Sequence, residues 1–161
     1  MKTGVNVCER ADECDLVFTR EFSAPVEAVY EAWTQPELLK EWWGPYGFSM
    51  TINEMSIAIG GIWDYVLHGP DGVSYPNRAV FEEVLPMQRL VIRNTGGHSV
   101  SQHLTCRMIV EFKGHGPSTV VTLTMRFATS AALGRARVMG AEQGGVESFE
   151  RLAKQVGGKK L

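Results

Sequence analysis

The sequence predicts an α+β fold in which one antiparallel sheet is covered by a long C-terminal helix. Between Phe48 and Phe127, short runs rich in β-branched and aromatic residues are separated by turns that contain Gly, Pro or Asp, as in consecutive hairpins. The last segment instead has apolar residues at helical spacing, namely Met139, Val146, Phe149, Leu152 and Val156. Strands joined by short links pair antiparallel, and their apolar face needs a cover. The final helix is expected to provide it.

About seven strands are expected from this pattern. They span residues 15–22, 48–59, 62–68, 74–84, 89–95, 104–113 and 119–127. The clearest inward alternations are Trp63, Tyr65 and Leu67; Cys106, Met108, Val110 and Phe112; and Val121, Leu123, Met125 and Phe127. Alternation places most charged strand residues on the opposite face, where solvation or cross-strand pairing is expected. These charged residues are Asp64, Arg78, Glu83, Arg93, Arg107, Glu111 and Arg126.

Two short helices are predicted after the first strand, and three of the four tryptophans lie in or beside them. Ser23 is expected to cap a helix from Pro25 to Thr34, in which Trp33 belongs to the apolar stripe and reads as core. Pro36 opens the second helix, which ends at Trp42-Trp43-Gly44-Pro45. Adjacent helical residues point about 100° apart, so Trp42 and Trp43 cannot both lie deep in one core. One of them is expected at a cavity mouth or against a partner.

The final helix is predicted from Ser130 to Val156, with glycines at positions 140, 144 and 145. Each glycine costs about 1 kcal/mol relative to alanine inside a helix, which favours a kink or a close backbone approach. No repeat or linker interrupts the chain, so residues 1–161 are predicted to form one domain, with a core of about 15–157 and a loosely ordered segment 1–14.

Composition excludes several classes of partner. The 161 residues carry a net charge of −2, which gives no reason to expect nucleic acid or an anionic membrane surface. The three cysteines are odd in number and form no CxxC pair, which argues against a disulfide framework and a zinc site and favours a cytoplasmic setting. No window approaches the length of about 18 apolar residues that a membrane span needs. No secretory leader is recognised.

No motif for metal binding or catalysis is present in the sequence. His68, His98, His103 and His115 are scattered over turns and strand ends without ligand spacing. There is no GxSxG elbow and no P-loop, and Cys106 reads as a small buried hydrophobe. His103 is the one histidine kept as a candidate, because it begins a strand whose later residues face the core. We therefore assign no cofactor, metal or catalytic residue.

A set of short motifs, in order along the chain, resembles a known family. They are Arg20–Pro25, Ala32–Glu37, Trp42–Pro45, Gly60–Trp63, His68–Gly72, Tyr75–Arg78, Glu83–Val84 with Pro86, Arg89–Val91, and Gly144–Gly145 with Phe149–Leu152. The chain is similar from Phe18 to Val156 to the AHSA-like family, named after an activator of the heat-shock chaperone ATPase, within the START-related helix-grip (SRPBCC) superfamily. The resemblance implies a curved sheet that grips the C-terminal helix. Many members carry a tryptophan where this chain has Gly145, so space is expected beneath the helix there.

The leading functional prediction is binding of a small hydrophobic or amphipathic ligand in an apolar cavity between the sheet and the last helix. The residues expected to line it are Trp42 or Trp43 at the mouth, and Met50, Trp63, Tyr65, His103, Met108, Met139 and Phe149. The superfamily resemblance implies two alternatives, a cyclase or hydrolase acting on a polyketide-like or aromatic substrate, and a cochaperone that docks a heat-shock chaperone. Chaperone docking ranks last. Homodimerisation is left open, since the sequence identifies no exposed aromatic patch.

Overall fold

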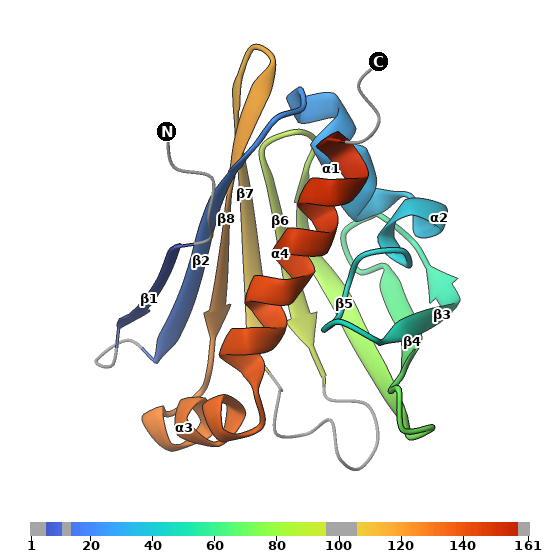
Figure 1. Ribbon diagram of the computed structural model, residues 1–161, viewed down its shortest axis with the longest axis vertical. Helices are drawn as coiled ribbons and strands as arrows, with labels where there is room; N and C mark the ends of the chain where they lie inside the picture. Colours follow the sequence, from blue (N-terminus) through green and yellow to red (C-terminus); the bar gives the residue numbers. More distant parts are fainter. Residues whose placement is uncertain (1–5, 11–13, 96–105, 158–161) are drawn as a thin grey trace.

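The computed structural model describes residues 6–10, 14–95 and 106–157, and its core is an eight-stranded sheet (Figure 1). The strands are β1 (Asn6–Arg10), β2 (Asp15–Phe22), β3 (Ser49–Met55), β4 (Ile62–His68), β5 (Ser74–Leu85), β6 (Arg89–Asn94), β7 (Arg107–His115) and β8 (Ser118–Arg126). The order across the sheet is β1-β2-β8-β7-β6-β5-β4-β3, and each neighbouring pair is antiparallel. The prediction of an α+β helix-grip fold with a curved antiparallel sheet is confirmed.

The seven predicted strands correspond to β2 to β8, whereas β1 was not predicted. This strand pairs with β2 in a register that runs from Asn6 opposite Thr19 to Arg10 opposite Asp15. Neither edge strand was identified as an edge, because periodicity shows which residues share a face but not which strand lies outermost. Among the residues that the structure describes, the two edges of the sheet are β1 and β3.

Four helices accompany the described part of the sheet: α1 (Val26–Thr34), α2 (Pro36–Leu39), α3 (Ser130–Val138) and α4 (Ala141–Gly157). The predicted Ser23 cap is wrong. Pro25 holds the N-cap position in an extended conformation, and its carbonyl accepts the backbone N–H groups of Ala28 and Val29. The prediction of one long final helix is also wrong, because this segment forms the two helices α3 and α4. Gly140 has φ +94°, a left-handed conformation that ends α3 and changes the chain direction before α4.

The helix α4 lies across the inner face of the sheet and supplies the centre of the core (Figure 1). Phe149 is fully buried, with its ring centroid 6.2 Å from that of Phe18 and 5.6 Å from that of Phe22. Trp33 is buried at 2% exposure, as predicted from the stripe of the first helix. The Phe18 ring lies directly against Gly145, since a Cβ built there would lie 2.3 Å from Phe18 Cζ. The space predicted beneath the helix lies beside this ring, where Gly144 and Gly145 line a cavity.

The outer face of the sheet carries the charged residues, and they pair across strands as predicted. Asp64 pairs with Arg78 between β4 and β5, at 2.7 Å. The carboxylate of Glu82 bridges Arg93 and Arg107. Further pairs on this face are Arg89 with Glu83, Arg89 with Glu111, and Arg126 with Asp15. These groups lie on the side of the sheet away from α4, so they do not reach the interior.

Candidate functional site

A cavity of about 250 Å³ lies between the inner face of the sheet, the segment that follows α2, and the first turns of α4. Nineteen residues line it: Trp43, Gly44, Pro45, Phe48, Tyr65, Leu67, Tyr75, Asn77, Asn94, Cys106, Met108, Leu123, Met125, Met139, Gly140, Ala141, Gly144, Gly145 and Ser148. Most are apolar. Four of the predicted ligand residues are brought together here, namely Trp43, Tyr65, Met108 and Met139.

The other predicted site residues lie elsewhere. Trp42 is fully buried, and its Nε1–H donates to the Ala32 carbonyl at 2.9 Å, so of the two adjacent tryptophans it is Trp43 that reaches the cavity. Trp63 lies behind Tyr65, with the two rings stacked at 4.2 Å, and Phe149 belongs to the core under α4. Met50 lines a separate hollow beside α2. His103 lies outside the described residues.

Tyr65 is the most deeply placed polar group of the cavity. It is 2% exposed, and burial raises the pKa of its phenol, although hydrogen bonds with the Trp43 and Asn94 side chains act in the opposite direction. The phenol is therefore neutral at pH 7 and keeps its O–H proton. Burial likewise raises the pKa of the neighbouring Cys106 thiol to about 12, so it carries no thiolate at pH 7.

Two buried amides also belong to the polar part of the lining, and neither was predicted. Asn77 is 7% exposed and Asn94 is 6% exposed. The signal was present in the sequence: each asparagine is in phase with the inward apolar residues of its own strand. Asn77 lies two residues before the buried Ala79 on β5, and Asn94 lies two residues after the buried Ile92 on β6. A polar residue on an inward stripe must satisfy its hydrogen bonds in the interior or at a cavity.

Comparison with known proteins identifies the family. Residues 23–157 match the family described as "Activator of Hsp90 ATPase homolog 1-like protein". The chain belongs to this family. No curated protein gives a significant match.

Solved structures share the family fold at low sequence identity. A protein from Mycobacterium smegmatis is 23% identical, with a TM-score of 0.87 and coverage of 97% of this chain and 99% of that one. A protein from Nitrosomonas europaea is 25% identical, with a TM-score of 0.81 and coverage of 91% and 96%. An AHSA1 protein from Silicibacter pomeroyi is 21% identical, with a TM-score of 0.72 and coverage of 91% and 99%.

Two further findings bear on the chemistry of this family member. The described residues contain no group of three or more His, Cys, Asp or Glu side chains that could hold a metal ion. Within the same residues, no helix combines the length and the apolar character that crossing a membrane requires.

The segment after α2 lines one side of the cavity, and Arg151 joins it to α4 by hydrogen bonds. Its guanidinium donates to the carbonyls of Gly44 and Pro45, each at 3.0 Å, and to that of Glu41 at 2.9 Å. Ser148 Oγ accepts the Gly44 N–H at 2.9 Å. Gly44 and Pro45 line the cavity, so these bonds set the position of its wall.

Arg151→Met should lower the free energy of unfolding by about 2 kcal/mol, because three carbonyls lose a charged donor while the aliphatic stem is kept. Urea unfolding measures this change, and Lys154→Met, an exposed position on the same helix, is the matched control. Equal stability of the two variants would show that the Arg151 bonds do not hold this wall in solution.

Stability should also fall at alkaline pH because of the Cys106 thiol, whose pKa rises from 9.0 to about 12 on folding. Below pH 9 the thiol is protonated in both the folded and the unfolded chain. Above pH 9 the unfolded chain loses the proton first, so the free energy of unfolding falls by about 1.4 kcal/mol per pH unit. Cys106→Ala should therefore reduce the slope of the unfolding free energy against pH between 9 and 12, measured by urea titration; the slope that remains includes the Tyr65 phenol, whose pKa burial also raises. Met108→Leu changes the same wall without removing a titrating group and should keep the wild-type slope.

Proposed function

We propose that this protein binds a small, uncharged, mostly apolar molecule that carries one hydrogen-bond acceptor oxygen. The observation that carries the proposal is the 250 Å³ cavity, with its apolar walls and the buried neutral phenol of Tyr65. Ligand pockets have this composition, with apolar walls and a few polar groups that orient the ligand. The volume of 250 Å³ lies just below the usual range of about 300–1,000 Å³, which favours a molecule of one or two rings.

The lining favours an uncharged ligand. Among the described residues that line the cavity there is no Asp, Glu, Lys, Arg or His. A carboxylate or an ammonium group would leave water without an opposite charge to compensate it. The phenol of Tyr65 and the amides of Asn77 and Asn94 suit a carbonyl, ether or hydroxyl oxygen instead.

The same residues favour binding over turnover. A general base must accept a proton near the working pH, and the raised pKa values of Tyr65 and Cys106 keep both groups protonated there. The phenol can donate a hydrogen bond but cannot remove a proton from a ligand. The described lining thus supports orientation of a bound molecule and provides no general base for a cyclase or hydrolase.

Acetophenone and ethylbenzene test the proposal as a matched pair, because they share one ring and a two-carbon substituent but only acetophenone has an acceptor oxygen. Both should bind the wild-type chain, with acetophenone the tighter ligand by calorimetry or by quenching of tryptophan fluorescence. Tyr65→Phe keeps the stacked ring and removes the hydroxyl, so it should weaken acetophenone about fivefold and leave ethylbenzene unchanged. Benzoate should bind more weakly than acetophenone.

A cavity-filling variant gives the control for location. Gly144 faces open space apart from Pro45 Cγ, 3.5 Å from a Cβ built there, so Gly144→Leu should place its side chain in the cavity. Both ligands should lose about tenfold or more in affinity. Binding unaffected by Gly144→Leu would place the ligand elsewhere, and equal loss of acetophenone and ethylbenzene affinity in Tyr65→Phe would remove the phenol from recognition.

A further inference from the structure

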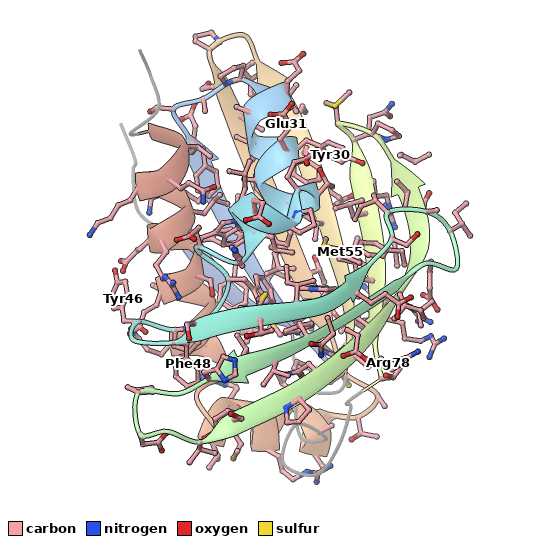
Figure 2. The ribbon with its side chains drawn as sticks, turned by 90° about the vertical axis from the view of Figure 1, so that its right-hand side faces the viewer. Tyr30, Glu31, Tyr46, Phe48, Met55 and Arg78 are labelled. Atoms are coloured by element: carbon pink, nitrogen blue, oxygen red, sulfur yellow. The ribbon has the colours of Figure 1, made fainter. Side chains whose placement is uncertain are left out.

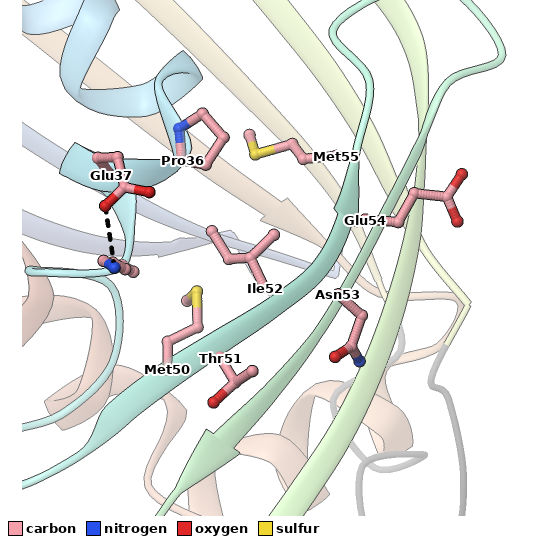
Figure 3. Close-up of a pocket in the computed structure, with 9 residues that line it drawn as sticks. Pro36, Glu37, Met50, Thr51, Ile52, Asn53, Glu54 and Met55 are labelled. Carbon is pink, nitrogen blue, oxygen red and sulfur yellow. Dashed lines mark ion pairs between the residues drawn. The ribbon is translucent and has the colours of Figure 1, made fainter.

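A second hollow, of about 420 Å³, lies outside the cavity between α2 and β3 (Figure 3). Its wall on the α2 side is formed by Pro36, Glu37 and Lys40, and Glu37 and Lys40 are paired with each other at 3.0 Å. On the other side it is lined by residues 50–55 of β3. In Figure 3 the side chains of Met50, Ile52 and Met55 point toward α2, whereas Asn53 and Glu54 point away.

The hollow runs along the edge of β3. Successive side chains of a strand point to opposite faces, so a pocket on one face is touched by every second residue. Here residues from both faces take part, six in a row, as is expected when the open space lies beside the strand in the plane of the sheet. The strand order agrees, because β4 is the only neighbour of β3 in the described sheet (Figure 2).

An edge strand carries backbone N–H and C=O groups that no neighbouring strand satisfies. Natural edges are usually protected by lysine, proline or a covering segment. The seven residues of β3, SMTINEM, contain neither lysine nor proline, and Glu54 is their one charge. A bulge between Ile52 and Glu54 is the only irregularity in its pairing with β4. Because the hollow separates α2 from β3, the open edge of β3 has room to pair with one more strand.

We infer that this hollow, a groove between α2 and β3, receives an extended peptide segment of another protein, which pairs with β3 as a ninth strand. Alternate side chains of that segment would contact Ile52 and Met55, which are only partly buried and form an apolar floor with Met50. A seven-residue strand spans about 23 Å, which matches the length of β3.

A peptide fits this groove better than a second copy of the chain. Antiparallel pairing of two β3 strands needs a twofold axis perpendicular to the sheet, which keeps both α2 helices on the same side of the joined sheet. The wall formed by Pro36, Glu37 and Lys40 would then face its own copy across the junction. The second β3 would also bring no cation to Glu54, which has no ion pair among the described residues. A peptide brings no α2 wall of its own to the junction, and a lysine or arginine placed opposite Glu54 supplies the cation.

N-methylation of a peptide tests strand addition directly. The probe is acetyl-Thr-Val-Thr-Val-Lys-Val-Thr-amide, together with variants that have isoleucine or leucine in place of valine, titrated into the full chain and followed by amide NMR. Resonances of β3 and α2 should shift, and backbone amides of β3 should become protected from hydrogen exchange. Methylating the alternate N–H groups that face β3 should weaken binding about tenfold or more, while methylating the opposite set should have little effect.

Charge and position supply the controls. Glu54→Gln should weaken the lysine peptide about threefold and leave a peptide with glutamine at that position unchanged. Gly144→Leu, which fills the separate cavity, should not alter peptide binding. Equal affinity of the two methylated peptides, absence of binding at 1 mM across the series, or shifts confined to the cavity would each overturn the inference. So would sedimentation showing a dimer that Ile52→Lys dissolves, since the occupant would then be a second copy.

Discussion

Gly145→Ala should destabilise the protein by about 2 kcal/mol or more, whereas Gly144→Ala, one residue earlier, should leave it equally stable or up to about 1 kcal/mol more stable. Both glycines lie inside α4, so both substitutions gain the same helix propensity. They differ in what the new methyl group meets. At Gly144 the nearest atom is Pro45 Cγ at 3.5 Å, an ordinary contact. At Gly145 three atoms of the Phe18 ring lie within 2.9 Å.

Phe18 cannot move away at low cost. Its side chain is fully buried, and it packs against Phe149 with ring centroids 6.2 Å apart. Accommodating a methyl group would push this ring into a packed core or lift α4 from the sheet. Added methyl groups in packed cores cost about 1–3 kcal/mol for this reason, and here that cost exceeds the helix gain.

Urea unfolding of the two variants measures the difference. A double variant gives a sharper result: Phe18→Leu should destabilise the wild type by creating space, yet it should partly relieve Gly145→Ala, so the two changes should couple by about 1 kcal/mol or more. Gly144→Ala should show no such coupling. Equal stability of the two alanine variants would mean that α4 does not approach β2 this closely in solution.

Much of the fold was accessible from sequence because its signals are local. The alternation of Trp63, Tyr65 and Leu67 identified both the strand and its inner face, and glycine- or proline-containing turns fixed the antiparallel connections. The break between α3 and α4 was harder to locate. Three glycines signalled an irregularity, and only the left-handed conformation at Gly140 shows where the helix ends.

The candidate site was predicted less well, because facing inward and lining a cavity are different properties. Phe149 faces inward but lies against Phe18 and Phe22, and Trp63 is covered by Tyr65 and Trp43. Deciding between a packed residue and a cavity residue requires the path of α4 over the sheet, which follows from contacts distant in sequence. Asn77 and Asn94 were not predicted because amides do not titrate and match no catalytic motif; their one signal in the sequence is that each is in phase with an apolar stripe.

The two candidate sites use different parts of one sheet. The cavity lies on its inner face under α4, whereas the groove lies along the β3 edge, and Met50 belongs to the groove while Tyr65 belongs to the cavity. Ile52 of β3 is the cross-strand partner of Tyr65 on β4. A strand added at β3 would therefore be separated from β4, which carries Tyr65, by β3 alone. Separate variants, Glu54→Gln and Tyr65→Phe, can test each site without disturbing the residues of the other.

Asp15→Ala should be the most destabilising single change among the ion pairs, by about 3 kcal/mol or more. Asp15 begins β2 and is 0% exposed, and its two carboxylate oxygens accept hydrogen bonds from Arg126 at the end of β8, at 2.9 and 2.8 Å. Removing the carboxylate leaves the half-exposed guanidinium without this partner and opens a space where β2 meets β8. Arg126→Ala should be equally harmful, because it leaves a buried carboxylate uncompensated.

Asp64→Ala is the matched control, because Asp64 also pairs with an arginine on the neighbouring strand, at 2.7 Å. Its carboxylate is 30% exposed, so water can replace Arg78 as a partner and the expected loss is about 1 kcal/mol or less. Urea unfolding at two salt concentrations separates the two cases, since salt should screen the Asp64 pair and have little effect on the Asp15 pair. Similar losses for both aspartates would show that burial does not set the strength of the Asp15 pair. A smaller loss for Asp15 would mean that the start of β2 opens readily to water.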